Sequence, residues 1–213
     1  AALQAGITLI NPTYLGGSGR NYYGDRLPSK LKVIWKLDLG SGRTQLGAGT
    51  PLWKGAGWTG QPLIVEEDGE LFLILGAHDH HLRKIRASSG EAIWKYRFDD
   101  VIKGTGTLWP DPDSGDLVII QGSRFGLDAR FDDPVIPSLR GISYQTGKEL
   151  WRMNCRRTAS YSRDVDGSAL VIGDRAYLAL ESAALFRAPQ AQALRVAVAA
   201  ECVHAYSLVH DDL

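Results

Sequence analysis

A short sequence pattern that occurs twice constrains the fold of this chain more than any other feature. The segment SSGEAIWK carries Gly90 and Trp94, and the segment QTGKELWR carries Gly147 and Trp151. A partial third copy, LKVIWK, contains Trp35 without the preceding glycine. Trp35 and Trp94 are 59 residues apart, and Trp94 and Trp151 are 57 residues apart. A repeat of this length indicates a fold built from stacked copies of one structural unit.

Each complete copy is preceded by two runs of β-branched and apolar residues with a turn between them. Asp68–Gly69 and Ser114–Gly115 stand where a tight hairpin turn is expected, before second strands at 71–75 and 117–121. A third unit opens with the same kind of turn at Asp166–Gly167. The order of strand, hairpin, strand, turn, strand, Ser/Thr-Gly turn and strand predicts four-stranded antiparallel units of the propeller-blade type.

Composition divides the chain at about residue 174. The 24 glycines punctuate the first part and do not occur after Gly173, where alanine becomes the commonest residue. Short apolar runs punctuated by glycine are typical of β structure, whereas an alanine-rich stretch is typical of helix. We therefore expect a mainly β fold, with a partial β-propeller of four-stranded antiparallel blades at 1–174 and a short α-helical segment at 175–213.

The two Gly-x-x-x-Trp segments make residues 1–174 resemble the PQQ-like β-propeller family. The resemblance implies that each tryptophan docks between neighbouring blades, with Gly90, Trp94, Gly147, Trp151 and Trp35 as the docking residues. It covers about four-fifths of the chain. Two to three blades are fewer than the four to eight or so that close a ring.

The family resemblance also bears on function. Quinone-dependent dehydrogenases of this family have an adjacent pair of cysteines over the cofactor, and Cys155 has no neighbouring cysteine here. We therefore expect a non-catalytic binding or scaffold fragment, without PQQ, whose ligand is an unknown protein or small molecule. The resemblance places the parent propeller in the periplasm or outside the cell. A quinone-dependent oxidoreductase is the weaker alternative.

The last part of the chain resembles a different family, the trans-prenyl diphosphate synthases. The segment ALRVAVAAECVHAYSLVHDDL resembles a long helix that ends in the first aspartate-rich motif of that family. Asp211 and Asp212 match its first two aspartates, which implies binding of Mg²⁺ bridged to an allylic diphosphate. The resemblance implies a cytoplasmic, Mg²⁺-dependent prenyl transfer as an alternative function. The lysine expected to bind isopentenyl diphosphate has no counterpart, so we expect no turnover from this chain.

The two resemblances meet without a linker. The segment GDRAYLAL, from Gly173 to Leu180, fits either a propeller strand or the start of a synthase helix. Natural fusions usually place an exposed polar or Pro/Gly-rich linker between domains. We therefore expect a partial sequence, chimeric between two unrelated genes.

Charge and hydropathy exclude two classes of partner. The 24 Lys and Arg residues balance 24 Asp and Glu residues, so no global field attracts nucleic acid. No run of about 18 apolar residues occurs, so no transmembrane helix is expected.

A cluster of histidines allows two interpretations. His78, His80 and His81 surround Asp79, and imidazole with carboxylate suits Zn²⁺. However, adjacent strand positions point to opposite faces, and an aspartate in such a segment is a common turn former. We favour the turn over the metal site.

Three further groups of residues have a functional and a structural interpretation. Arg156 and Arg157 could form an anion patch, but a solvated loop is favoured. Ser160 and Ser162 have no His and Asp partners for nucleophilic catalysis. Three tryptophans could form a ligand platform, but packing is favoured; they are Trp53, Trp58 and Trp109.

Overall fold

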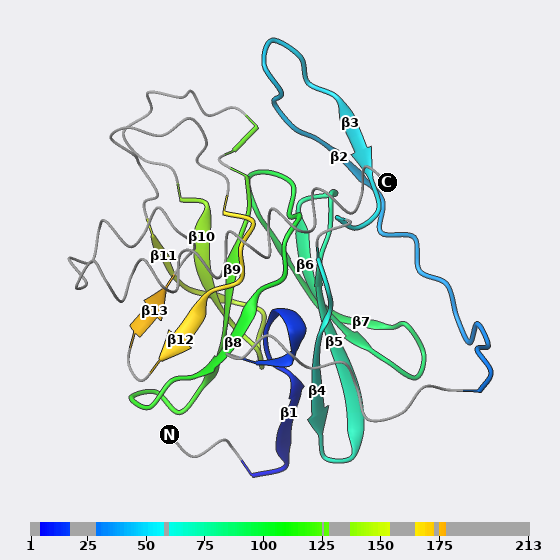
Figure 1. The fold of residues 1–213 in the computed structure, drawn as a ribbon, viewed down its shortest axis with the longest axis vertical. Coiled ribbons are helices and arrows are strands. Elements are labelled where there is room, and N and C mark those ends of the chain that lie inside the picture. The colour runs from blue at the N-terminus through cyan, green and yellow to red at the C-terminus, as the bar shows by residue number, and fades with distance from the viewer. Residues whose placement is uncertain are drawn as a thin grey trace. The chain divides into compact units, whose positions relative to one another are not determined.

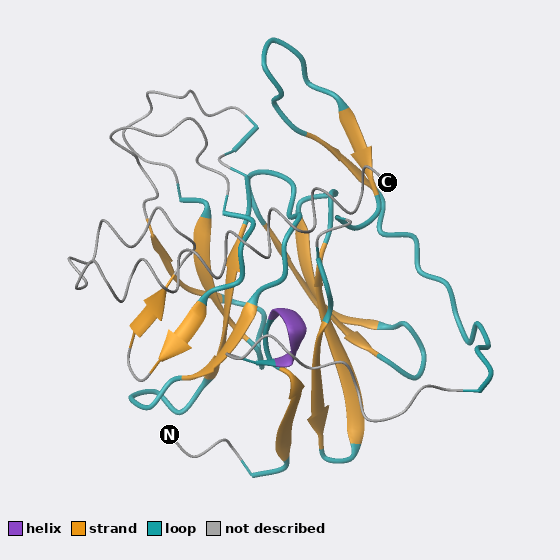
Figure 2. Cartoon of the chain, viewed as in Figure 1, coloured by secondary structure: helices purple, strands orange, loops and turns teal. Residues whose placement is uncertain are grey.

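The computed structural model describes residues 5–17, 29–57, 60–124, 126–127, 137–153, 165–172 and 175–177. Within these residues the fold is mainly antiparallel β-sheet, which confirms the β class expected from the sequence (Figures 1 and 2). The one helical element in the described residues is a short 3₁₀ turn, η1 (Tyr14–Gly16). No helix in this part of the chain is long and apolar enough to span a membrane. The helical segment expected after residue 177 lies outside the described residues.

The first large sheet has five strands in the order β1-β4-β5-β6-β7. The hairpin expected at Asp68–Gly69 is confirmed, because both residues have positive φ, 51° and 81°, as a two-residue primed turn requires. β4 alternates buried and half-buried residues, as expected for a strand with one face in a core. The strands are β1 (Ile7–Asn11), β4 (Leu63–Glu67), β5 (Glu70–Gly76), β6 (His81–Arg86) and β7 (Ala92–Arg97).

The second large sheet has four strands in the order β11-β10-β9-β8. Its first turn is wider than the two-residue turn expected at Ser114–Gly115. The loop runs from Asp111 to Asp116, because the Asp111 carboxylate accepts hydrogen bonds from the backbone N–H of Asp113 (3.0 Å) and from the Ser114 hydroxyl (2.6 Å). The strands are β8 (Thr107–Pro110), β9 (Leu117–Gly122), β10 (Leu139–Ser143) and β11 (Glu149–Met153).

Two short hairpins complete the described elements. β2 (Ser41–Arg43) pairs with β3 (Leu52–Lys54), and β12 (Leu170–Ile172) pairs with β13 (Arg175–Tyr177). Residues 175–177 of the ambiguous GDRAYLAL segment are therefore in a strand. Both described strands of this region, β12 and β13, lie after Asp166–Gly167. The hairpin turn expected at Asp166–Gly167 therefore does not join two described strands. The chain divides into two compact units, Ala1–Ser168 and Ala169–Leu213.

One hydrophobic core joins the two large sheets within the first unit. β9 is buried along its whole length, as expected for the continuous apolar run LVII between two packed faces. The described residues form no closed ring of sheets. The core consists of Leu63, Val65, Ile74, Leu82, Phe98, Ile102, Leu108, Leu117, Ile119, Ile142 and Tyr144.

Candidate functional site

The tryptophan of the partial repeat, Trp35, lies against the turn that joins β6 to β7. Its indole Nε1 donates a hydrogen bond to the Ala87 carbonyl over 2.7 Å. Gly90 in this turn has φ of 78°, and a Cβ atom there would lie 2.8 Å from the Trp35 ring. Only glycine satisfies both the left-handed backbone and the close approach of the ring.

Trp94 repeats this arrangement between the two large sheets. It extends from β7 of the first sheet, and its indole Nε1 donates to the Tyr144 carbonyl in the β10–β11 turn over 2.9 Å. Gly147 in that turn has φ of 67°, and a Cβ atom there would lie 2.6 Å from the Trp94 ring. In both cases the accepting carbonyl lies three positions before the glycine. The structure therefore brings together Trp35 with Gly90 and Trp94 with Gly147.

Trp151 has a different environment. It lies on β11 directly opposite Gly141 of β10, and a Cβ atom at Gly141 would lie 2.2 Å from the indole. Trp151 therefore packs within its own sheet in the described part of the chain. At the corresponding place in the first sheet, Trp94 is opposite Lys84 rather than a glycine.

A buried polar network centred on Glu67 crosses from the first sheet to the β10–β11 turn. The Lys84 ammonium donates to the Glu67 carboxylate over 2.6 Å, and the Tyr144 hydroxyl donates to the same oxygen over 3.1 Å. Lys84 also lies 3.8 Å above the centre of the Tyr144 ring, a cation–π geometry. Lys84 is only 4% exposed, so the Glu67 carboxylate supplies the charge that compensates its burial.

The pKa values in this network follow from burial and from these hydrogen bonds. Burial raises the pKa of Tyr144, and the neighbouring Glu67 carboxylate raises it further. Burial alone would raise the pKa of Glu67, but the hydrogen bonds from Lys84, Gln145 and Tyr144 outweigh it and hold the pKa below its ordinary range. Near neutral pH Tyr144 is therefore a neutral phenol and Glu67 a carboxylate.

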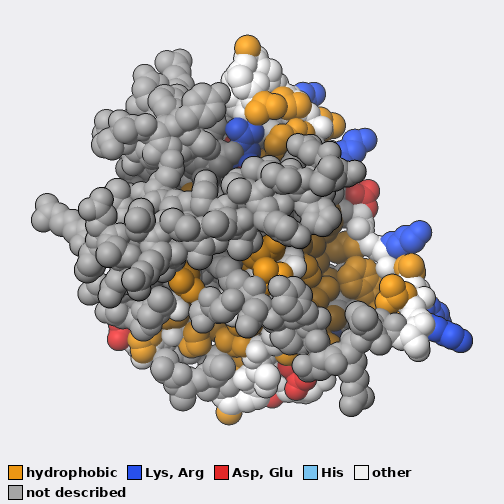
Figure 3. Space-filling view, in the orientation of Figure 1, with side chains coloured by type: hydrophobic (Ala, Val, Ile, Leu, Met, Phe, Trp, Pro, Cys, Tyr) orange, Lys and Arg blue, Asp and Glu red, His pale blue; other side chains and the backbone are white. Residues whose placement is uncertain are grey.

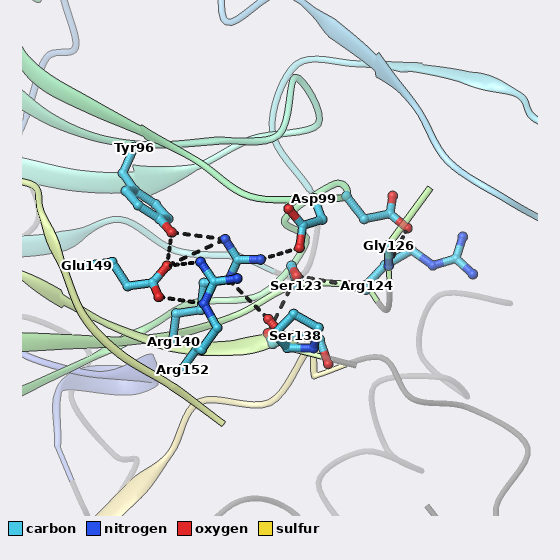
Figure 4. A network of polar contacts seen from close by, with 11 residues as sticks. Tyr96, Asp99, Ser123, Arg124, Gly126, Ser138, Arg140, Glu149 and Arg152 are labelled. Carbon is cyan, nitrogen blue, oxygen red and sulfur yellow. Dashed lines mark hydrogen bonds and ion pairs between the residues drawn. The ribbon is translucent and has the colours of Figure 1, made fainter. Parts of the chain in front are cut away.

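A second buried network surrounds Arg140 of β10 (Figure 4). Its guanidinium, 2% exposed, donates to the Pro137 carbonyl over 3.0 Å, to the Tyr96 hydroxyl over 2.9 Å and to the Asp99 carboxylate. The Tyr96 hydroxyl in turn donates to the Glu149 carboxylate. Because Tyr96 is on the first sheet and Arg140 on the second, this network also joins the two sheets.

Glu149 has a second cationic partner at the surface. Arg152 donates to its two carboxylate oxygens over 2.6 and 2.8 Å. Burial alone would raise the pKa of Glu149, but the hydrogen bonds from Arg152 and Tyr96 hold it below its ordinary range. Burial raises the pKa of Tyr96, and its hydrogen bond to Glu149 adds to this effect.

The histidine cluster forms the β5–β6 turn, as favoured from the sequence. The Asp79 carboxylate accepts a hydrogen bond from the backbone N–H of His81 over 3.2 Å and pairs with Arg83. Each histidine has a separate partner: His78 Nδ1 lies 3.0 Å from the Lys54 carbonyl, His80 Nε2 lies 2.8 Å from the Arg43 carbonyl, and His81 Nδ1 contacts Asp79. The described residues contain no group of three or more His, Cys, Asp or Glu side chains that could hold a metal ion.

The remaining residues singled out in the sequence divide into two groups. Trp53 packs edge-on against the His78 ring with 5.3 Å between ring centres, and Trp109 is a half-buried residue of β8. The others lie outside the described residues: Trp58, Cys155, Arg156, Arg157, Ser160, Ser162, Asp211 and Asp212.

Sequence reasoning did not find the residues of the two polar networks. Lys84 and Arg140 each stand next to an apolar strand residue, in the segments LRKIR and LRGIS. A charge in such a strand is usually on a solvated face, so the pattern carried no signal of burial. Trp94 and Gly147, which bring the two sheets into contact, were found from the sequence.

A scan against protein-family models and a search of curated proteins both give no match for this chain. Function is therefore inferred from the geometry of the described residues and from the sequence.

Proposed function

We propose that residues 1–174 are a non-catalytic binding or scaffold segment built from blades of the PQQ-like β-propeller type. The observation that carries this proposal is the repeated docking of a tryptophan on a left-handed glycine in the next turn, with the same indole-to-carbonyl hydrogen bond. Two occurrences of one contact at equivalent repeat positions are typical of a stacked-repeat architecture.

The chemistry of the buried charges also supports a structural role. Lys84 is paired with Glu67, and Arg140 with Asp99 and Glu149, so these charges hold the sheets together. A general acid or base must have a proton-transfer group within reach of a substrate, whereas these charged groups are paired with one another inside the protein. The lone Cys155 lacks the neighbouring cysteine of the quinone-dependent enzymes, so the proposal excludes PQQ as a cofactor.

The proposal is tested by offering the chain the cofactor and substrates of both enzyme classes. PQQ is titrated while its absorbance and the tryptophan fluorescence are followed, and a dye-linked dehydrogenase assay is run in parallel. We expect neither saturable binding nor dye reduction. One equivalent of PQQ bound with dye reduction would replace the scaffold assignment with an oxidoreductase.

A second candidate function rests on the sequence resemblance of the HDDL segment. If Asp211 and Asp212 hold Mg²⁺, the chain joins an allylic diphosphate to isopentenyl diphosphate by a new C–C bond, with release of pyrophosphate from the allylic substrate and of a proton. The assay compares the native chain with the D211A/D212A variant. Mg²⁺-dependent release that the variant loses would favour this candidate, and equal background in the two proteins would reject it.

A further inference from the structure

Residues 30–38, with the sequence KLKVIWKLD, lie between η1 and β2 and belong to no described strand pair; we call this segment the open strand. It carries the partial repeat, so its Trp35 corresponds to Trp94 of β7 and Trp151 of β11. β7 is the fourth strand counted from β4, and β11 is the fourth strand counted from β8. Trp35 docks on the Gly90 turn in the same way as Trp94 docks on its own turn. The open strand thus has the docking contact of a fourth strand.

The open strand lacks the pairing of a fourth strand. Within the described residues, no backbone N–H or C=O group of residues 30–38 makes a hydrogen bond. Figure 1 shows this blue segment running along the outside of the sheets, at the right of the view. Leu31, Val33 and Ile34 are 90%, 69% and 69% exposed. In Figure 3 hydrophobic and Lys/Arg side chains lie together along the same edge.

The sequence of the open strand is nearly symmetric about Ile34. Reading outward from Ile34, the residues on the two sides are valine and tryptophan, then two lysines, then two leucines, then Lys30 and Asp38. An antiparallel strand pair places residues that are equidistant from the twofold axis opposite each other. The open strand is therefore complementary to a second copy of itself.

We propose that the open strand is a self-association site, at which two copies of this chain pair antiparallel about Ile34. Leu31 then faces Leu37 of the second copy, and Lys30 faces Asp38 of the second copy, twice each by symmetry. Such pairing satisfies the free backbone groups and covers the exposed aliphatic side chains. Trp35 keeps its contact with Gly90, because strand side chains point away from the edge that carries the backbone groups.

One pair in this register is unfavourable. Lys32 faces Lys36 of the second copy, and like charges directly opposite each other weaken a strand pair. A single strand pair also buries less than a standard interface of about 1,600 Å². The dimer is therefore weak and concentration-dependent, and the opposed lysines provide a test of its register.

The first test is sedimentation velocity of the full chain over a concentration series. We expect the native chain to dimerise as its concentration rises, and the Ile34→Lys variant to remain monomeric because charges meet at the twofold axis. Leu46→Lys is the matched control, since Leu46 is another exposed aliphatic residue, 56% exposed, in the β2–β3 loop. A native chain that stays monomeric throughout, or a dimer that Ile34→Lys leaves intact, would overturn the proposal.

The second test checks whether the two copies pair in the proposed register. Lys32→Glu or Lys36→Glu alone converts two like-charge pairs into two opposite-charge pairs, so each should lower the dimer Kd by about tenfold. The double variant restores like charges, and its Kd should return toward the native value. Both lysines are exposed, so we expect these substitutions to leave the fold unchanged. Single and double variants with additive effects would mean that the two lysines do not face each other, and the register would be wrong.

Discussion

At the scale of single residues, glycines with the same backbone conformation differ in what surrounds them. Gly147 and Gly115 have φ of 67° and 70°, which any side chain would adopt only with strain. A Cβ atom at Gly147 would lie 2.6 Å from the Trp94 ring, whereas nothing lies within 4 Å of a Cβ atom at Gly115. The two positions therefore separate the cost of the backbone from the cost of displacing the tryptophan.

Replacing these glycines by alanine should give unequal losses of stability. Gly115→Ala is expected to lower the free energy of unfolding by about 1–2 kcal/mol, from backbone strain alone. Gly147→Ala is expected to lower it by about 2–4 kcal/mol, because the methyl group also displaces the Trp94 ring. Urea unfolding followed by circular dichroism measures both. Equal losses would show that the ring moves aside at no cost.

At the scale of elements, Trp94 is the side chain by which β7 contacts the β10–β11 turn of the other sheet. Trp94→Phe removes the hydrogen bond to Tyr144 and should cost about 1 kcal/mol. Trp94→Ala also removes the packed ring and should cost about 3–5 kcal/mol. The comparison is made by urea unfolding, with Trp109→Phe as the control for loss of an indole group on a half-buried strand position. Similar losses for Trp94→Phe and Trp94→Ala would mean that the ring itself contributes little.

The β5–β6 turn contains a residue in an unusual conformation. His80 has φ of 70°, in the place where such turns commonly have glycine, and its Nε2 atom contacts the Arg43 carbonyl. His80→Ala keeps the strain and loses the contact, so it should cost about 1 kcal/mol. His80→Gly loses the contact but also relieves the strain, so its thermal unfolding midpoint should be close to native. A midpoint for His80→Gly below that of His80→Ala would contradict this explanation.

At the scale of the whole first unit, the Glu67 network makes stability depend on pH in both directions. The pKa of Glu67 is below its ordinary value of 4.5 in the folded chain, so the unfolded chain takes up protons first as pH falls. The pKa of Tyr144 is above its ordinary value of 10.0, so the unfolded chain loses protons first as pH rises. The free energy of unfolding is therefore expected to fall below about pH 4.5 and above about pH 10.

Two substitutions test which residue causes the loss of stability at low pH (the acid limb) and which causes it at high pH (the alkaline limb). Glu67→Gln should flatten the acid limb, and it should cost about 2–4 kcal/mol at neutral pH because Lys84 remains buried without its carboxylate. Tyr144→Phe should flatten the alkaline limb. Glu66→Gln, on the opposite face of β4, is the control and should leave the acid limb unchanged. An acid limb that Glu66→Gln and Glu67→Gln alter equally would reject the role of the Lys84 pair.

The features predicted correctly from the sequence depend on local chemistry. The Asp68–Gly69 hairpin follows from two residues that tolerate positive φ between apolar runs. The turn role of Asp79 follows from a carboxylate that can accept the backbone N–H two positions later. The width of the loop before β9 was missed, because the choice between a two-residue turn and the longer loop from Asp111 to Asp116 depends on which side chains meet in the folded chain.

The sequence by itself determined the β class, the order of β4 to β7 and of β8 to β11, and the repeat that spaces the tryptophans, but it did not predict β1, which adds a fifth strand to the first sheet. Period-2 alternation, turn residues and repeat length are all readable along the chain. Only the tertiary structure decided that Lys84 and Arg140 are buried. Alternation assigns a side chain to one face of a strand, but whether that face meets water or another sheet depends on residues distant in sequence, here Glu67, Tyr144 and Tyr96.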